Sequence, residues 1–421
     1  MIRVRKGRPE EHALFVLIGV CSALVCTFYA ELFSLTEDLS VKVFSKNPAL
    51  LFVIAPLGLL TSHWLVRRFA PGSGGSGIPQ VLACIQDASG ELSKNLLRKS
   101  VVVVKILSSL VAVFAGAAIG REGPSLQISA AIARNLGALA SRVRVSMKAE
   151  QLLVAGAASG LAAAFNTPIG GIVYAIEELS REHVRTFRDV LLLSVVIAGL
   201  TAQLAAGNYL YLGYPRVPKL YGFTLILVAG GLGFACGVLG GCFSKLLAWL
   251  TRWHEGNALS TQLLTVAGVG VVLAASFLYL GGPSLYSGKE VINQTLFSTE
   301  PVGIPLALAR FLTPLLSSIT GIAGGVFAPS LSAGAAVGSF TASLLGSEFG
   351  TVFALTGMVG FLTGVTHTPI TSFILVLEMT DRHSVVLPMM VAAVFSSLGA
   401  RLVSEKSFYE VRLERFAAPR S

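Results

Sequence analysis

The sequence predicts an all-α integral membrane protein, and three observations support this. Only 13% of the 421 residues are charged, whereas soluble domains average about 25%. Hydrophobic residues make up 53% of the chain, and 44 glycines add to the non-polar fraction. Several apolar runs approach the length of about 20 residues that an α-helix needs to cross a bilayer. Together these observations exclude a soluble globular protein.

The apolar runs fall into two length classes. The long runs, which we expect to span the membrane, lie near 13–34, 49–66, 100–119, 189–206, 222–248, 263–281 and 385–402. Shorter runs, broken by Gly or Pro, lie near 76–86, 123–140, 151–165, 168–180, 303–319, 328–345, 350–366 and 369–377. Because lipid offers no hydrogen bonds, backbone interrupted at membrane depth must line a cavity enclosed by protein. Many broken helices therefore indicate a transport pathway.

Charge and cysteine patterns exclude several partners. The net charge is 32 − 22 = +10, but Lys and Arg fall in short clusters between apolar runs, so we expect no nucleic-acid partner. No CxxC pair and no His at ligand spacing accompany the cysteines, so we expect no metal site and no cofactor. The apolar run from Ala13 lacks a small-residue cleavage site, which favours a retained membrane helix over a signal peptide. The five cysteines, interpreted as packing residues, are Cys21, Cys26, Cys84, Cys236 and Cys242.

An internal repeat organises the chain. Shifting the sequence by 201 positions places AFNTPIGGIVYAIEEL over VTHTPITSFILVLEMT and pairs Glu177 with Glu378. A shift of 205 pairs the pattern GxxxPSL at Gly120 with the same pattern at Gly325. Chance recurrence of Gly, Pro and Ser is the alternative. We predict one transmembrane domain, 1–421, with repeats near 13–210 and 220–405, and repeats of this kind place a substrate at their interface near the midplane.

The glycine-rich run GSGGSGIP, from Gly72 to Pro79, predicts an anion site. It lacks the Lys and hydroxyl that close a nucleotide-binding phosphate loop, and it lies between membrane segments. A glycine-rich turn with Pro in the first helical turn leaves free backbone N–H groups, and here the Ser76 hydroxyl, at the positive end of a helix. A flexible loop is the alternative. The residues of this candidate loop are Gly75, Ser76, Gly77, Ile78 and Pro79.

The segment GREGP places a carboxylate between glycines at another predicted helix start. Ionisable residues inside a membrane are costly and therefore functional by default, which makes Glu122 a candidate proton carrier. A carboxylate aimed at a helix N-terminus can also occupy a site meant for an anion until it is protonated. The alternative is that Glu122 pairs with Arg121 and only caps the helix. The other residues of this loop are Gly120, Gly123 and Pro124.

The segment GGVFAP, 324–329, is the counterpart of GREGP in the second half. Val326 and Phe327 replace the charged pair, so only the backbone donors that follow Gly325 remain. A site built from N–H groups without a full basic charge binds an anion without trapping it, as rapid transport requires. A contact between small residues of two helices is the alternative.

Two further features concern acidic and aromatic residues. Glu177 and Glu178 end a stretch without charged residues, 151–176, and successive helical positions diverge by about 100°, so they cannot share one face. One is expected to contact basic neighbours while the other meets a polar path, and an interfacial pair matched by the following arginines is the alternative.

Tyr409 near the chain end, in the C-terminal segment 406–421, is by itself typical of an interfacial anchor.

GSGIP, GREGP, the Glu177-Glu178 pair, GGVFAP and the terminal Tyr409, taken in this order, resemble the CLC family of chloride channels and chloride/proton antiporters. The resemblance covers most of the chain. It implies a homodimer with one pore per subunit, each built from two inverted-topology halves of tilted and broken helices. It also implies chloride and protons as the transported ions and no enzymatic activity.

The resemblance assigns roles to residues. The hydroxyls of Ser76 and Tyr409 would coordinate chloride from the cytoplasmic side, and the N–H groups of Val326 and Phe327 from the other. Glu122 would be the external gate. Glu178 would be the internal proton acceptor, which in the family marks antiporters. Serine at position 76 resembles the chloride-preferring branch.

One position departs from the family pattern, and several alternatives stay open. Many members follow GSGIP with a glutamate, whereas Gln80 stands here, so any charge network near this helix is in question. We predict a chloride/proton antiporter, with a passive channel of the same fold as the alternative. An intramembrane hydrolase using Ser76 with His63 or His367 is the remaining class, but no G-x-S-x-G elbow occurs.

The basic clusters predict the orientation. Lys and Arg are enriched on cytoplasmic loops, so both termini are expected in the cytoplasm. The chain stops 12 residues after Tyr409, which we interpret as the absence of a soluble regulatory domain and as typical of a prokaryotic inner-membrane protein embedded in lipid. The clusters are Arg3 to Arg8, then Arg181, Arg185 and Arg188, and finally Lys406, Arg412, Arg415 and Arg420.

Overall fold

The fold is all α-helical. The computed structural model describes residues 9–87, 89–145, 147–179, 188–207, 210–218, 223–298 and 300–417. Over these ranges it contains eighteen α-helices, and extended pairing is limited to two isolated β-bridges. The predicted fold class is therefore confirmed.

Six helices are long and apolar enough to cross a bilayer within the described ranges. The predicted span near 100–119 is wrong at its C-terminal end: helix α5 (Lys99–Phe114) has only 16 residues. After Phe114 the chain leaves the helix, and residues 115–121 run without helical structure toward the interior. The six long helices are α1 (Pro9–Lys46), α2 (Leu51–Phe69), α9 (Arg188–Ala206), α10 (Phe223–Gly256), α11 (Leu259–Leu280) and α17 (Val386–Val403).

The shorter apolar runs form the broken helices that the Gly and Pro interruptions predicted. They are α3 (Ile78–Gln86), α6 (Glu122–Arg142), α7 (Ala149–Phe165), α8 (Pro168–Tyr174), which continues as a π-helical turn (Ala175–Leu179), α13 (Ile304–Ile319), α14 (Phe327–Leu344), α15 (Gly350–Thr366) and α16 (Pro369–Thr380). Three further helices carry no clear apolar signal: α4 (Glu91–Leu96), α12 (Lys289–Phe297) and α18 (Phe408–Ala417). Prolines at the first or second position of α8, α13 and α16 fix where these helices begin.

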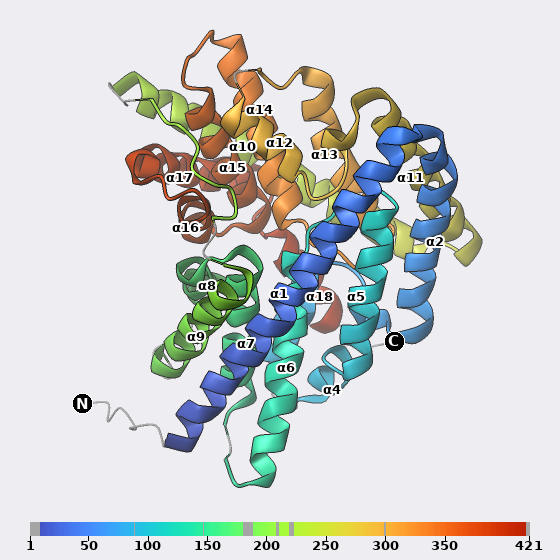
Figure 1. Cartoon of the computed structure of the whole chain (residues 1–421), viewed down its shortest axis with the longest axis vertical. Helices are drawn as coiled ribbons and strands as arrows, with labels where there is room; N and C mark the ends of the chain where they lie inside the picture. The colour runs from blue at the N-terminus through green and yellow to red at the C-terminus, as the bar shows by residue number, and fades with distance from the viewer. Residues whose placement is uncertain are drawn as a thin grey trace.

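Glycines bring helices into backbone contact in the core. A Cβ atom added at Gly237 of α10 would lie 2.2 Å from the carbonyl oxygen of Ser396 in α17. A Cβ atom added at Gly334 of α14 or at Gly357 of α15 would likewise lie 2.2 Å from the carbonyl oxygen of the other glycine. Close approach of this kind drives helix association in lipid, where the hydrophobic effect is absent. Figure 1 shows α1 lying diagonally across one face, with α10 and α14 to α17 to its upper left, α8 and α9 to its left, and α5 and α6 to its right.

Part of the charge pattern that predicted the orientation lies outside the described residues. Arg3 to Arg8, Arg181, Arg185 and Arg420 fall in this group, as does the side chain of Arg188. Lys406, Arg412 and Arg415 are described, and the last two lie on α18. Residues Phe408–Ala417 of the predicted C-terminal segment form helix α18.

Candidate functional site

Three glycine-rich loops meet in the interior and bring three helix N-termini together. The N–H of Gly75 donates to the carbonyl of Ile322 (2.8 Å), and the N–H of Gly324 donates to Gly75 (3.1 Å). Gly120 and Gly325 exchange two hydrogen bonds, of 2.8 and 2.7 Å. These bonds join the segments that lead into α3, α6 and α14. The positive ends of the three helices are therefore held at one place, as an anion site requires.

The loop before α3 has a shape that only glycine adopts easily. Gly75 and Gly77 have φ angles of +66° and +96°. A Cβ atom at Gly77 would also lie 2.7 Å from Oε1 of Gln127. Gln80, which departs from the family pattern, donates its side-chain amide to the carbonyl of Gly74 (2.7 Å). A neutral hydrogen bond thus holds the loop at this position.

Lys105 supports the same loop from α5. Its ammonium group donates to the carbonyl of Gly75 (3.0 Å), and its side chain is fully buried. Lys105 is the one charged residue in the apolar run near 100–119, and no motif marks it. The available signal was its position, since a lone charge inside an apolar run is a functional candidate.

Glu122 is the first residue of α6 and is completely buried. Its carboxylate lies against Gly120, where a Cβ atom would be 2.2 Å from Oε2, and near the backbone N–H of Ala328 in α14. Arg121 reaches α1, donating to the carbonyl of Ala30 and to Oγ of Ser34, and its guanidinium lies 5.6 Å from the ring centroid of Tyr211. The carboxylate therefore lies among the loops that hold the three helix N-termini together.

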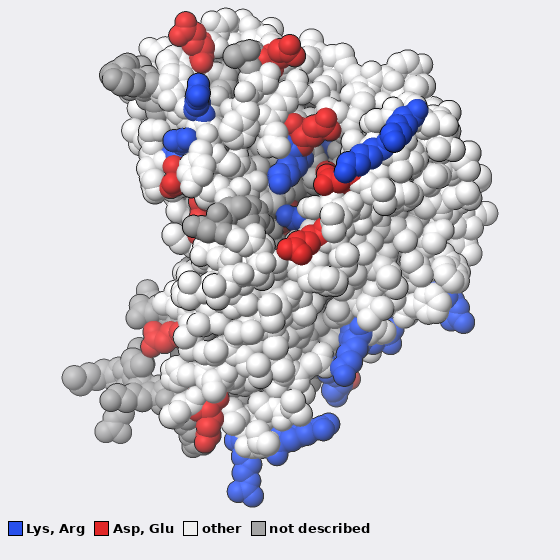
Figure 2. Space-filling model, viewed as in Figure 1, with Lys and Arg blue, Asp and Glu red and all other residues white. Residues whose placement is uncertain are grey.

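A cavity of about 570 Å³ leads to Glu122 from the face shown in Figure 2. We call it the α1-side cavity; charged residues of α1 and α12 line it together with Arg121 and Glu122. Acidic and basic side chains gather around this hollow between α1 and α12 (Figure 2). The other charged residues in its wall are Glu37, Asp38, Lys42, Lys289 and Glu290.

Ser76 and Tyr409 bring two hydroxyls together at the other side of the loops. Oγ of Ser76 accepts a long bond from the N–H of Ile78 (3.4 Å), which leaves its proton free to donate, and the phenol of Tyr409 lies beside it. The Tyr409 ring stacks on Phe327 (centroids 6.3 Å apart, planes at 14°). Within the described chain, the buried hydroxyls of Tyr409 and Tyr174 make no full hydrogen bond. Buried hydroxyl donors without protein partners call for an explanation, and an anion that accepts from them is one.

Glu178 and Glu177 point to different surroundings. Glu178 is buried, at 5% exposure, and its charge acts on the hydroxyls of both Tyr174 and Tyr409. The charge of Glu122 also acts on Tyr409. The two carboxylates thus both lie within electrostatic range of one tyrosine hydroxyl. Glu177 turns away to the N-terminus of α16, where it accepts hydrogen bonds from the N–H groups of Ile370 (3.1 Å) and Thr371 (2.7 Å), so this carboxylate caps a helix.

Comparison with known proteins decides the family. The family described as voltage gated chloride channel matches residues 57–401. The chain belongs to the CLC family. The CLC protein named H(+)/Cl(−) exchange transporter ClcA from Vibrio cholerae is 30% identical over 96% of this chain and 88% of its own length. ClcA from Klebsiella pneumoniae is 31% identical over 88% and 79%.

Solved CLC structures share the fold. A slow cyanobacterial Cl−/H+ antiporter superposes with a TM-score of 0.86 at 23% identity, covering 98% of this chain and 99% of its own. A CLC-type fluoride/proton antiporter gives 0.79 at 20% identity, covering 96% and 97%. At these identities the likeness establishes the fold alone.

The two histidines considered for a hydrolase lie apart from Ser76 in this CLC chain. Nδ1 of His63 lies 2.7 Å from the carbonyl oxygen of Thr320, and its ring contacts that of His254 at 5.9 Å. His367 is the residue after α15, with φ at +58°. The small cavity beside Ser76 is lined by neither histidine. The serine and histidine positions therefore do not resemble a nucleophile and its base.

Proposed function

We propose that this CLC chain is a chloride/proton antiporter and not an enzyme. The observation that carries the proposal is that the buried hydroxyl of Tyr409 lies within electrostatic range of both carboxylates, Glu122 and Glu178. An anion held at Tyr409 lies next to both groups that can carry a proton. Its relatives named as H(+)/Cl(−) exchange transporters support the same function.

Chloride is the substrate of the site and is coordinated by dipoles. Ser76 and Tyr409 offer hydroxyl protons, and the N–H groups of Val326 and Phe327 face them from the start of α14. The buried, unpaired hydroxyl of Tyr409 supports this assignment. Donors without a full charge release the ion again, which transport requires.

Glu122 acts as the external gate by competing with chloride for the same helix N-termini. When it takes a proton from the α1-side cavity, its attraction to these N-termini falls and chloride replaces it. The proton then passes toward Glu178, the internal acceptor, while chloride moves the opposite way. Because chloride leaving and a proton entering carry current in one direction, the cycle responds to voltage by about 2.3 kcal/mol per charge per 100 mV.

The surroundings of the site follow from the same proposal. The chain is a multi-pass protein of the cell inner membrane with both termini cytoplasmic, and it forms a homodimer in lipid. Two inverted repeats, near 13–210 and 220–405, form its single transport domain. Equivalent hydrogen bonds at equivalent repeat positions support this division: Glu177 caps α16, and Glu378 caps α8.

A passive chloride channel is the second candidate, because the same donors would conduct without proton coupling. The test uses purified protein in chloride-loaded liposomes with an outward chloride gradient and external pH recorded. Proton uptake against its gradient, driven by chloride efflux, is the expected result. Chloride efflux that moves no protons until an ionophore is added would contradict antiport and indicate a channel.

A further inference from the structure

A second cavity, of about 400 Å³, lies on the side of the site where α18 packs. We call it the α18-side cavity. Its wall is rich in basic groups from α2, α10 and α18, and its single acidic residue among the described chain is Glu255. The rings of His63 and His254 contact each other in this wall, and three of their four ring nitrogens make no hydrogen bond within the described residues. The basic residues are His63, Arg67, His254, Arg412 and Arg415.

A narrow space of about 40 Å³ shares part of its wall with this cavity and reaches Ser76 of the proposed anion site. We call it the throat; it is lined by Ser76, Gly324, Val326 and Phe408 among others. Within the described chain, Arg412 is the one charged residue in its wall. Arg412 also lines the α18-side cavity, whereas Arg415 lines only that cavity. An anion moving from the cavity to Ser76 therefore passes the guanidinium of Arg412.

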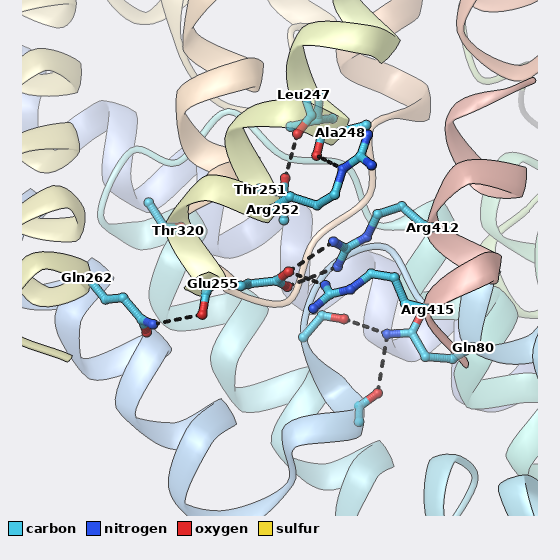
Figure 3. Close-up of polar contacts among 12 residues, drawn as sticks. Gln80, Leu247, Ala248, Thr251, Arg252, Glu255, Gln262, Thr320, Arg412 and Arg415 are labelled. Carbon is cyan, nitrogen blue, oxygen red and sulfur yellow. Dashed lines mark hydrogen bonds and ion pairs between the residues drawn. The ribbon is translucent and has the colours of Figure 1, made fainter. Parts of the chain in front are cut away.

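Glu255 holds both arginines, but unequally. Figure 3 shows the two side chains extending from α18 toward the carboxylate at the end of α10. Arg412 makes two long contacts, of 3.3 and 3.2 Å, compared with about 2.7 to 2.9 Å for a strong charged hydrogen bond. Arg415 lies closer to the same carboxylate. Arg412 uses two N–H groups on Glu255, and since a guanidinium has five N–H groups it keeps donors for another anion.

We propose that Arg412 binds chloride at the junction of the α18-side cavity and the throat, and that Glu255 competes with chloride for its guanidinium. Arg412 lies three residues, about one helical turn, after Tyr409 on α18, so the two groups point to the same end of the pathway. Chloride captured by Arg412 moves on to the hydroxyls of Ser76 and Tyr409. This inference rests on the proposed function, because it takes chloride as the transported ion.

Three substitutions distinguish anion binding from a structural role of the ion pairs. Arg412→Gln removes the proposed site and should raise the half-saturating chloride concentration about three- to tenfold. Glu255→Gln removes the competitor and should lower it. Arg415→Gln is the matched comparison, since it removes the same charge and an ion pair to the same carboxylate but lies outside the throat; because Glu255 then meets Arg412 alone, it should raise the value by less than Arg412→Gln does. If the ion pairs of Glu255 with the two arginines only held α18 in place, all three substitutions would shift the half-saturating chloride concentration in the same direction.

The measurement is the initial rate of chloride efflux from liposomes loaded with a range of chloride concentrations. Liposomes hold molecules in both orientations. The plot of efflux rate against chloride concentration for Arg412→Gln should therefore contain two components, one with the half-saturating chloride concentration of the parent and one with a raised value. Arg412→Lys, which keeps a positive charge, should recover most of the affinity. A curve for Arg412→Gln that superimposes on that of Arg415→Gln would overturn the inference.

Diffraction gives an independent readout. Crystals grown in bromide should show an anomalous peak beside the guanidinium of Arg412, absent from Arg412→Gln and stronger in Glu255→Gln. If both the parent and Glu255→Gln show a bromide peak at Ser76 but none at Arg412, this inference is overturned and the proposed function stays intact. Parent protein that moves no chloride at all would instead contradict the proposed function.

Discussion

Glu177 and Glu378 cap each other's helices. Glu177, in the π-helical turn that follows α8, accepts hydrogen bonds from the backbone of Ile370 and Thr371 at the start of α16. Glu378, in α16, accepts bonds from Ile169 (3.0 Å) and Gly170 (2.8 Å) at the start of α8. Each carboxylate thus meets the positive end of the other helix, where an anion is stabilised. The arrangement locks α8 to α16, and the two residues are those that the repeat pairs at a shift of 201.

Replacing either cap should lower stability without changing the transport mechanism. Glu177→Ala and Glu378→Ala each leave two backbone N–H groups without their acceptor, and each should cost about 1 kcal/mol. The measurement is thermal unfolding in detergent. Glu348→Ala, at an exposed acidic residue, is the control and should leave the unfolding temperature unchanged. Equal unfolding temperatures for the caps and the control would contradict the capping role.

Replacing Glu122 should separate chloride transport from proton transport. Glu122→Gln keeps the size of the side chain but cannot take up or release a proton, so chloride flux should persist while chloride-driven proton uptake disappears. The measurement is parallel recording of chloride and pH in liposomes. Continued proton pumping would show that another group carries the proton at the gate.

Glu178 and Glu177 provide a matched pair of adjacent carboxylates. Glu178→Gln should abolish proton uptake, because its carboxylate lies beside the tyrosines of the site. Glu177→Gln should keep proton uptake and lower only the unfolding temperature, because it caps α16. Coupling unchanged by Glu178→Gln would leave the internal acceptor to be found elsewhere.

A single methyl group at Gly123 should disturb chloride binding. A Cβ atom there would lie 2.5 Å from Oγ and 2.7 Å from the carbonyl oxygen of Ser76, so the serine must shift. We expect Gly123→Ala to weaken chloride binding at least about tenfold, measured by calorimetric titration of the purified protein. Gly268→Ala in α11 is the control, since no atom lies within 4 Å of the added group. Equal chloride affinity in both variants would show that Ser76 tolerates the shift.

The local motifs were readable from the sequence because their physics is local. A glycine-rich turn with Pro after it predicts a helix start, and α3 begins at Ile78 as expected. The same reasoning placed Glu122 at the beginning of α6. The span near 100–119 was too long because apolar composition alone does not show where a helix ends to deliver Gly120 to the interior.

The partners of these motifs could not be read from the sequence. Nothing local indicates that Lys105 holds Gly75, or that Glu177 leaves its own segment to cap a helix almost 200 residues away. The alternative in which the Glu177-Glu178 pair contacts only neighbouring arginines was based on the charges that lie nearest in the sequence. The tertiary structure adds backbone N–H groups of α16 as donors to Glu177, whereas Arg181 and Arg185 lie outside the described residues.

The sequence by itself determined that this is a membrane protein with broken helices and three glycine-rich helix starts, because hydropathy and turn chemistry depend on near neighbours. Only the tertiary structure decided that the loops at Gly75, Gly120 and Gly325 meet, and that Arg412 lies between a basic cavity and Ser76. The physical reason is that an anion site made of backbone dipoles needs several helix ends at one point. That convergence is set by packing between distant segments.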